Sequence, residues 1–363
     1  MNIAFFIGEM NLRGVANSTY QYSIYNKKIL KNKSIIFYDK SNHRNDNQVI
    51  KKFKKKFNVI GIDNLEEIDS YKYRLSLDYL YIQKSGQKDK WQSKNIKTII
   101  HSVYPQKLNQ VHGDRYAYIS EWLSNQFSRN KVPFVPYIVK IEKNKNDLKA
   151  KLRIKKNQIV FGCHGGHSSF DLKFAQDTIF ELVNKRKDIT FIFLNINKFC
   201  KHPRVIFLRG TADEKFKNKF INTCDGMIYG RSLGESFGIA CGEFSVQGKK
   251  IICYRFNRHR SHVKNISNNN FIEYSSRKEL SKIFENFSKK KISLKNNYFN
   301  YKPHLVMKSF QKIFLKRNED IDLSIIDYSY NLFNFFAMHY RYFCHKFYNH
   351  YYNFFESKFI FRK

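Results

Sequence analysis

Two glutamates, Glu235 and Glu243, stand eight residues apart in the run Glu235-Ser-Phe-Gly-Ile-Ala-Cys-Gly-Glu243. A short apolar run that ends near Tyr229 precedes them and is typical of a buried strand. We expect a helix to begin near Ser236, so a rise of roughly 12 Å would separate the two carboxylates. Each carboxylate can accept charge-assisted hydrogen bonds from neighbouring hydroxyl groups. The pair is therefore a candidate for holding two hydroxyl-bearing ends of one extended ligand.

The start of this expected helix adds a second kind of chemistry. Its first backbone N–H groups lack partners within the helix and attract anions such as a diphosphate. Gly238 would let a ligand approach the backbone at this point. Ligands of doubly wound folds bind at the carboxyl ends of parallel strands, where this segment is expected to lie. Two glutamates at this spacing also arise by chance, but the Gly242-Glu243 step and the strand-like run at 248–252 favour a site.

Short apolar runs alternate with amphipathic stretches in the first part of the chain. This alternation predicts strands and helices arranged around a parallel sheet. The predicted strands are residues 3–7, 34–38, 58–60, 79–81 and 97–101. The first domain is predicted to cover residues 1–139, and the charged stretch 140–157 is the candidate linker.

The same alternation begins again after the linker. Its predicted strands are residues 158–161, 190–194, 205–208, 226–229 and 250–254, with helices at 169–185, near 211–222 and after Glu235. No strand is expected after about residue 270, where an amphipathic helix at 303–315 follows. The predicted fold is α/β, with two Rossmann-like doubly wound domains facing a cleft. They are residues 1–139 and 158–302, followed by a helix at 303–317 and a helical tail at 318–363.

The tail from residue 318 onward is rich in Phe, Tyr and His. Two interpretations are open, because aromatic rings with scattered basic residues suit a lipid interface, whereas an aromatic helix also packs well on a protein body. The packed extension is the favoured interpretation. Peripheral association with a membrane, or with a partner, is the alternative.

The chain of 363 residues carries 66 Lys and Arg against 30 Asp and Glu, which gives a formal net charge of +36. This excess indicates either a polyanionic partner or a compositional bias acting on solvated surface positions. Basic runs such as 51–56 and 289–291 fit solvated faces, and no zinc-finger or RNA-recognition signature accompanies them. No nucleic-acid partner is therefore expected.

The six cysteines form no C-x-x-C pair, which favours a reducing compartment. The first residues read as a strand rather than a signal peptide, and no apolar stretch approaches the ~20 residues of a membrane span. A cytoplasmic protein is expected, with peripheral attachment to the cytoplasmic face of a membrane as the alternative.

The run from Glu235 to Ile252 resembles the E-x7-E region of retaining GT-B glycosyltransferases of the family 4 and family 1 group. The resemblance extends over roughly residues 1–317 and is most specific in the second half. Further agreeing features are Gly8 and Gly14 after the first strand, His101 in the first domain, the run 209–231, and the helix at 303–315.

The resemblance implies roles for individual residues. Glu235 would contact the transferred sugar and Glu243 the ribose, while His101 would face the reacting centre. The remaining donor-binding positions implied by the resemblance, or proposed beside it, are Gly8, Gly14, His167, Lys173, Arg209, Arg231, Phe237 and Gly238. A packed or capping role is the alternative for His101.

One position departs from the family pattern. An Arg usually follows the first strand of the second domain, but here the chain reads Gly162-Cys163-His164-Gly165-Gly166-His167. The cation that neutralises the leaving diphosphate would come instead from Lys173, Arg209 or Arg231. His164, His167 and Asp171 are a weak metal-binding pattern, so no metal and no cofactor are expected.

The function implied is a metal-independent, retaining transfer of a hexose from a nucleoside diphosphate sugar to a glycan or lipid-linked acceptor. The nucleotide sugar would be a co-substrate. A nucleotide-sugar epimerase on the same fold is one alternative. The other is a basic protein that binds nucleic acid or membranes and carries a degenerate enzyme site.

Overall fold

The computed structural model describes residues 1–89, 91–140, 145–266, 271–287, 289, 296–316, 321 and 328–356. The chain divides into two compact units. Unit 1 comprises Met1–Lys140 and Asn300–Asn334, and unit 2 comprises Ile141–Phe299 and Phe335–Lys363.

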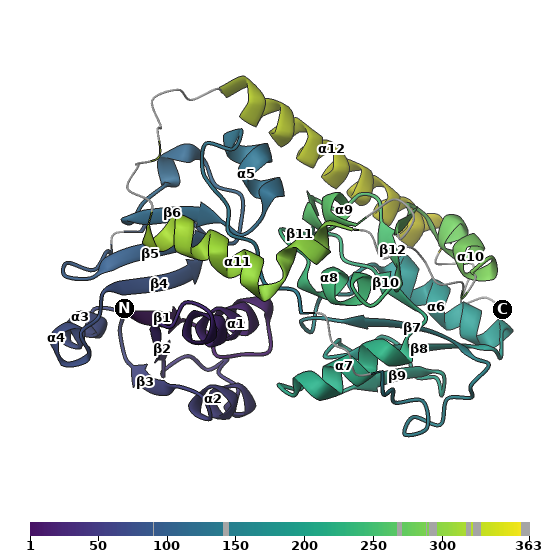
Figure 1. The fold of residues 1–363 in the computed structure, drawn as a ribbon. Coiled ribbons are helices and arrows are strands. Elements are labelled where there is room, and N and C mark those ends of the chain that lie inside the picture. The colour runs from purple at the N-terminus through teal and green to yellow at the C-terminus, as the bar shows by residue number, and fades with distance from the viewer. Residues whose placement is uncertain are drawn as a thin grey trace. The chain divides into compact units, whose positions relative to one another are not determined.

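Unit 1 contains a sheet of six parallel strands in the order β3-β2-β1-β4-β5-β6 (Figure 1). This is the strand order 3-2-1-4-5-6 of a Rossmann-like domain, with the switch point between β1 and β4. The strands are β1 (Asn2–Ile7), β2 (Lys33–Asp39), β3 (Asn58–Ile62), β4 (Tyr79–Lys84), β5 (Lys97–Ser102) and β6 (Arg115–Tyr118). Strands β1 and β5 are buried on both faces because helices cover both sides of the sheet.

The helices of unit 1 come from both ends of the chain. They are α1 (Gly14–Lys28), α2 (Asn47–Lys54), α3 (Glu67–Ser70), α4 (Lys72–Leu75), the 3-10 turn η1 (Leu108–Gln110), α5 (Glu121–Ser128), α11 (Pro303–Phe310) and its π-helical continuation η4 (Gln311–Leu315). The predicted helix at 303–315 is therefore confirmed. Its Phe310 ring lies 5.4 Å from Tyr22 of α1, which packs this late segment into the core of unit 1.

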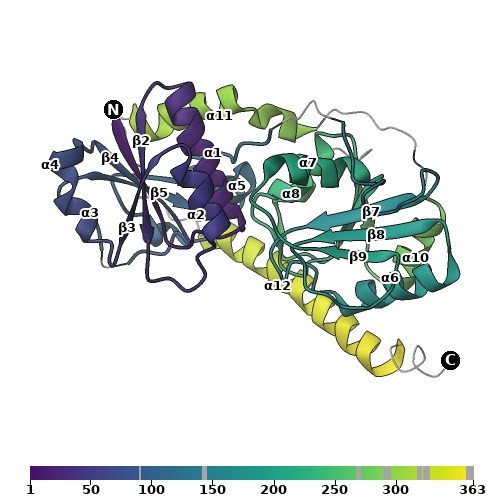
Figure 2. The same ribbon diagram turned by 90° about the horizontal axis from the view of Figure 1, so that it is seen from below.

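Unit 2 repeats the architecture with the order β14-β12-β10-β7-β8-β9. Its strands are β7 (Ile159–His164), β8 (Ile189–Leu194), β9 (Val205–Leu208), β10 (Gly226–Tyr229), β12 (Lys250–Tyr254) and β14 (Phe271–Tyr274). Its helices are α6 (Lys173–Lys185), α7 (Glu214–Thr223), α8 (Ile239–Ser245), α9 (Ser261–Asn265) and α10 (Arg277–Glu285). The 3-10 turn η3 (Asn297–Tyr301) follows them and includes the chain boundary between the two units. Figure 2 shows α6 and α10 on one face of the sheet and α7 and α8 on the other.

The C-terminal tail contains one long helix, α12 (Tyr328–Tyr351), which continues as the π-helical turn η5 (Tyr352–Glu356). The predicted fold class, two Rossmann-like α/β units with an aromatic-rich helical tail, is confirmed. Residues 317–320, 322–327 and 357–363 of this region, and 141–144 of the expected linker, lie outside the described residues. In the part of the chain that is described, no helix is long and apolar enough to cross a membrane.

Three details of the sequence interpretation are wrong. A strand does follow residue 270, because β14 pairs with β12 although its outer residues are only half-buried. Strand β6 was not predicted, since it spans only four residues and begins with an arginine. The helix after Glu235 begins at Ile239 rather than near Ser236.

The late start of α8 has a backbone cause. Glu235 belongs to the short strand β11 (Gly234–Glu235), which pairs in parallel with β13 (His259–Arg260). Gly238 then adopts a φ of 88°, a left-handed conformation that interrupts any helix from Ser236. The two glutamates therefore do not lie on one helix, since Glu235 is in β11 and Glu243 is in α8. The helical rise of roughly 12 Å does not describe their separation.

Replacing Gly238 by alanine should lower the free energy of unfolding by about 1–3 kcal/mol from backbone strain alone. An added Cβ would also lie 2.8 Å from both His262 Cβ and Tyr298 Oη. Gly14→Ala is the matched control, because this glycine is exposed at the start of α1, and it should change stability by less than about 1 kcal/mol. Denaturant unfolding measures the stability of both variants. Equal losses of stability in the two variants would contradict the strained, closely packed position assigned to Gly238.

Candidate functional site

The centre of the unit 2 sheet is the point where its strand order reverses. Here β7 and β10 pair in parallel, with Gly226 opposite Phe161. Ligands of doubly wound domains bind outside the carboxyl ends of the strands at such a switch point. His164 is the last residue of β7, and Arg231 follows two residues after β10 ends at Tyr229. The polar residues that follow these strands therefore form the candidate site.

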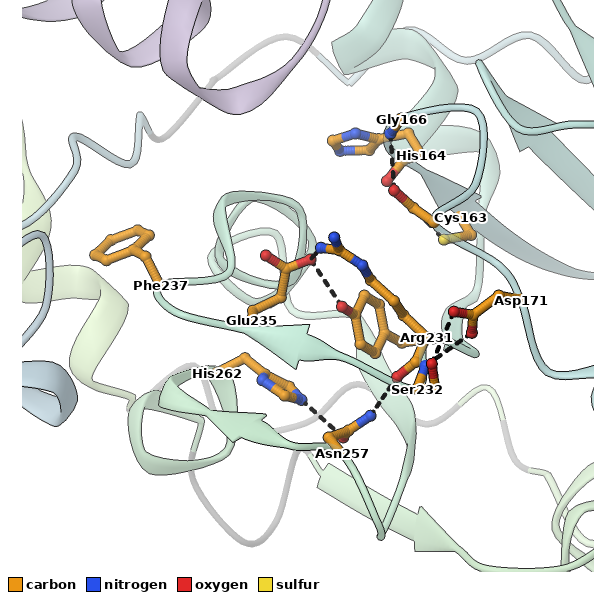
Figure 3. A network of polar contacts seen from close by, with 12 residues as sticks. Cys163, His164, Gly166, Asp171, Arg231, Ser232, Glu235, Phe237, Asn257 and His262 are labelled. Atoms are coloured by element: carbon orange, nitrogen blue, oxygen red, sulfur yellow. Dashed lines mark hydrogen bonds and ion pairs between the residues drawn. The ribbon is translucent and has the colours of Figure 1, made fainter. Parts of the chain in front are cut away.

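Glu235 is held by two donors at this edge of the sheet. Tyr229 Oη donates to Glu235 Oε1 at 2.7 Å, and Arg231 Nη1 lies 3.1 Å from the same oxygen. Figure 3 shows the carboxylate pointing toward the guanidinium, and Oε2 carries no contact among the residues drawn. The Glu235 side chain is 24% exposed. One oxygen is thus fixed, and the other is left to accept a bond.

The protonation states of these donors suit that arrangement. Burial, reinforced by the nearby Glu235 charge, raises the pKa of Tyr229 well above its ordinary value, so the phenol keeps its proton and donates it. Burial is the largest single influence and would lower the pKa of Arg231, but the charge and hydrogen bond of Glu235 together with Tyr229 outweigh it and raise the pKa. The guanidinium therefore stays charged beside the carboxylate.

The loop that carries Arg231 is tied down on two sides. Asn257 Nδ2 donates to the carbonyl of Arg231 at 2.5 Å. The backbone N–H and the hydroxyl of Ser232 donate to the two carboxylate oxygens of Asp171 at 2.7 and 2.8 Å. These bonds fix the direction in which Arg231 leaves the main chain (Figure 3).

Asn257 belongs to a buried cluster behind the site. Its Oδ1 accepts from Cys253 Sγ at 3.1 Å and lies 3.2 Å from His262 Nε2. Burial, followed by the charges of Arg260 and Arg231, lowers the pKa of His262 to about 3. Burial raises the pKa of Cys253 well above its ordinary value. Both groups are neutral and fully buried, so the cluster supports the Arg231 loop and has no reactive thiolate.

Glu243 lies on α8 in a second charged group. It forms an ion pair with Lys217 of α7, and its Oε2 is 3.0 Å from His164 Nε2 but poorly aligned for a hydrogen bond. Burial acts to raise the pKa of Glu243, but Lys217 and His164 together outweigh it and lower the pKa to about 2. Glu243 is thus a permanently charged carboxylate at the end of β7.

Cys163 is the second-last residue of β7, and the glycine-rich loop that begins with Gly165-Gly166 follows the strand. That thiol is fully buried, and burial together with Glu235 raises its pKa. The charge of Arg231 acts on the same thiol in the opposite direction. Cys163 in β7 and Arg231, two residues after the neighbouring strand β10, lie at the same edge of the sheet. Asp171 is occupied by Ser232, and among the described residues no group of three His, Cys, Asp or Glu side chains could hold a metal ion.

The other residues predicted for donor binding lie in varied surroundings. Lys173 pairs with Asp177 in the first turn of α6, Arg209 is exposed after β9, and His167 is exposed in the loop after β7. Phe237 is buried, and its carbonyl accepts from Tyr298 Oη at 2.9 Å. In unit 1, Gly8 follows β1, its carbonyl accepts from Asn42 Nδ2 at 3.0 Å, and Gly14 begins α1.

His101 is fully buried in unit 1. Its Nε2 donates to the carbonyl of Val135 at 2.9 Å, so Nδ1 accepts from the Tyr81 hydroxyl at 2.6 Å. The ring also packs against Phe314, 5.2 Å away. As placed, the imidazole contacts protein groups, which corresponds to the packed histidine that the sequence left as an alternative.

Sequence reasoning missed three residues that shape the site. Tyr229 reads as an ordinary strand residue, and Lys217 is one of several lysines in α7. Asn257 follows β12 in a polar stretch with no motif. A strand-end Tyr six residues before Glu235 is the signal that could have been used, since its hydroxyl reaches beyond the sheet edge.

The sequence matches no protein-family model and none of the curated proteins. Solved structures match in fold. The Anabaena protein HepE in complex with UDP and glucose aligns with 11% identity and a TM-score of 0.63, over 86% of this chain and 98% of that one. A glycosyltransferase from Rickettsia africae aligns with 12% identity and a TM-score of 0.62, over 87% and 99%. The Neisseria meningitidis UDP-GlcNAc 2-epimerase bound to UDP-GlcNAc aligns with 11% identity and a TM-score of 0.54, over 87% of this chain and 100% of that one.

These structures share the fold across nearly their whole length. The chain therefore has the GT-B type of fold. At this level of identity the likeness extends to the architecture alone, and the chemistry has to be argued from the residues of the site.

The imidazole of His101 should remain neutral when the folded protein is titrated from about pH 8 to about pH 5. Burial lowers its pKa to about 3, whereas an unfolded histidine titrates near 6.5. The stability that it contributes is therefore complete above pH 6.5 and is lost as the pH falls toward 3. NMR of the ring nitrogens measures the protonation, and a proton gained near pH 6.5 would contradict the burial.

Glu243 should stabilise unit 2 in a pH-dependent way, by up to about 3 kcal/mol. Its pKa falls from 4.5 to about 2 on folding, so the stabilisation is complete above pH 4.5 and is lost as the pH falls through 2. Glu243→Gln should flatten the pH dependence of the melting temperature in this window. Lys217→Met should move the loss to higher pH, because the main attractive charge is gone. An unchanged profile for Glu243→Gln would refute the pairing.

Proposed function

We propose that this protein is a glycosyltransferase that moves a hexose from a nucleoside diphosphate sugar to a glycan or lipid-linked acceptor. The observation that carries the proposal is Glu235 at the switch point of unit 2, with one carboxylate oxygen fixed by Tyr229 and Arg231 and the other available. Structures of the same fold hold UDP with glucose, and UDP-GlcNAc. A nucleotide sugar needs a group that accepts hydrogen bonds from its sugar hydroxyls, and beside it a cation for its diphosphate.

Glu235 is proposed to bind the transferred sugar. A carboxylate oxygen whose neighbour is already held by two donors cannot rotate freely, so its remaining lone pairs point in a fixed direction. A sugar hydroxyl that donates to Oε2 would complete the hydrogen bonding of the group. Orientation of the anomeric carbon would then follow from the rigidity of the Arg231 loop.

Arg231 is proposed to neutralise the leaving diphosphate. The family that the sequence resembles usually supplies an arginine near the position of Cys163, and here Arg231 follows β10, the strand that pairs with β7 at the same edge of the sheet. Its guanidinium stays charged and can bind phosphate oxygens in a bidentate manner. The bonds of Asn257 and Asp171 to the loop hold it without reorganisation during the reaction.

Glu243 is proposed to bind the ribose. The Glu243 side chain is 15% exposed, and its Oε2 lies 3.0 Å from His164 Nε2 without a well-directed hydrogen bond. A ribose diol offers two donors and two acceptors, which suit a carboxylate oxygen beside an imidazole nitrogen. Lys217 would keep the carboxylate charged while the ligand exchanges.

The proposed step is a transfer with retention and without a metal or cofactor. The bond between the anomeric carbon and the diphosphate oxygen breaks, and the acceptor hydroxyl oxygen bonds to that carbon from the same face. The hydroxyl proton passes to the departing phosphate oxygen, so no side-chain nucleophile is required. Positioning by Glu235 and charge stabilisation by Arg231 supply most of the rate.

Glu235→Gln should reduce sugar transfer and donor hydrolysis by about 10²–10³-fold, because the amide donates where the sugar hydroxyl needs an acceptor. The substrate would first be found by thermal shift, since a donor at 100 times its Kd stabilises the protein by ~2.7 kcal/mol. Rates are then measured with that donor.

Asp188→Asn is the matched control, because Asp188 forms a similar ion pair with Arg186 at 2.6 Å but directly precedes β8, at the opposite end of the strands from the switch-point loops. It should leave both rates unchanged. Equal rates for wild type and Glu235→Gln would refute the role of Glu235.

A nucleotide-sugar 2-epimerase is the second candidate. Epimerases from Listeria monocytogenes and Neisseria meningitidis share the fold with TM-scores of 0.57 and 0.54. An epimerase removes and returns a proton at the sugar C2, so NMR in deuterated water would show deuterium at that carbon. A transferase leaves the C2 hydrogen in place and releases the nucleoside diphosphate.

A further inference from the structure

Helix α12 carries a row of exposed aromatic residues on the side that faces away from unit 2. Phe336, Phe343 and Phe347 are 60%, 65% and 67% exposed. Tyr340 and Phe354 are exposed in the same way. We call these five residues the aromatic face of α12. The solvent side of a surface helix is normally polar, so an apolar face of this kind marks an interaction site.

The spacing places these residues along one line. Positions 336, 340, 343, 347, 350 and 354 follow steps of four and three, which keep side chains on one side of a helix. Five of the six are aromatic, and the sixth is His350. The aromatic face therefore extends over most of α12 and its continuation η5.

The opposite side of α12 is bonded to unit 2. Arg341 Nε donates to the carbonyl of Asn257 at 3.0 Å, and the backbone N–H of Arg277 donates to Tyr348 Oη at 2.9 Å. Tyr352 Oη donates to Asp177 at 2.7 Å, and the Tyr348 ring packs on Phe174. Rotation of the helix to bury the aromatic face would break all of these contacts. Figure 1 shows α12 passing α9 and α10 in this arrangement.

The charge of the chain decides between the surfaces that could cover the aromatic face. Residues 328–355 contain no Asp or Glu, and Lys346 is exposed beside the face. The whole chain has a net charge of +36. A second copy would bring two such charges together, and its seam would consist of aromatic rings and histidine instead of the aliphatic residues that pack in coiled coils. An anionic surface has the complementary charge.

We propose that the aromatic face of α12 binds the surface of an anionic lipid bilayer. Because the opposite side of the helix is bonded to unit 2, the helix lies in the plane of the membrane with its rings at the boundary of headgroups and acyl chains. Phe and Tyr suit this boundary, and Lys346 reaches the headgroups beside them. The inference is independent of the proposed enzymatic function.

The test uses the full chain and vesicles of phosphatidylglycerol mixed with phosphatidylcholine, separated by flotation. The wild-type protein should float with these vesicles, bind phosphatidylcholine alone far less, and dissociate in part at 1 M salt, where the Debye length is about 3 Å. Phe343→Ser with Phe347→Ser should weaken binding by about tenfold or more, because two rings leave the interface. Phe347→Trp should retain binding and shift its fluorescence to the blue when anionic vesicles are added.

The matched control is Tyr73→Ser with Phe180→Ser, two exposed aromatics outside α12, and it should bind as the wild type does. Since Phe343 and Phe347 are exposed, their double variant should keep the wild-type melting temperature, which separates lost binding from lost folding. The proposal is overturned if the double variant floats like the wild type, or if the wild type does not bind anionic vesicles. The proposal is also overturned if α12 is a dimer interface. In that case the wild-type protein would not bind vesicles, and its molecular mass in solution would be that of a dimer and would fall to that of a monomer in the double variant.

Discussion

Parallel pairing between β7 and β10 determines where polar chemistry can lie in unit 2. Both strands are buried over most of their length, so polar side chains enter at the last strand residue or after it. At that point the segments that follow the two strands turn away from each other, and these loops leave room at the edge of the sheet. His164, Arg231 and Glu235 are all placed by this one constraint, and α8 then brings Glu243 to the same edge.

Two carboxylates in a partly buried site are costly unless each has positive or donating partners. The structure meets this cost separately for each group, with Arg231 and Tyr229 at Glu235 and with Lys217 and His164 at Glu243. The buried histidines behind the site, His259 and His262, have pKa values lowered to about 3 by burial and so add no further charge. The cluster of Asn257, Cys253 and His262 behind the site thus supports the Arg231 loop through neutral hydrogen bonds, whereas the Asp171 carboxylate holds the loop from its other side.

The sequence predicted the strands that are continuous apolar runs, such as β8 and β12, because burial on both faces leaves a clear signal. It failed at β14, where Glu273 interrupts the pattern, and at the start of α8, where the left-handed backbone of Gly238 overrides the expected helix. Glu235 and Glu243 could be picked out by spacing. The partners Tyr229, Lys217 and Asn257 could not, since each is defined by tertiary packing, and the burial of His101 is likewise invisible in a local run of residues.

The contact of Arg341 with the Asn257 and Arg258 carbonyls has a practical meaning. The same Asn257 holds the carbonyl of Arg231, so a residue near the C-terminus braces the loop that carries the candidate cation. A shortened chain that ends before α12 would be easier to handle, since it lacks the exposed rings, but it would also release this brace. Protein engineered for crystallisation should therefore exchange aromatic surface residues one by one and keep the helix.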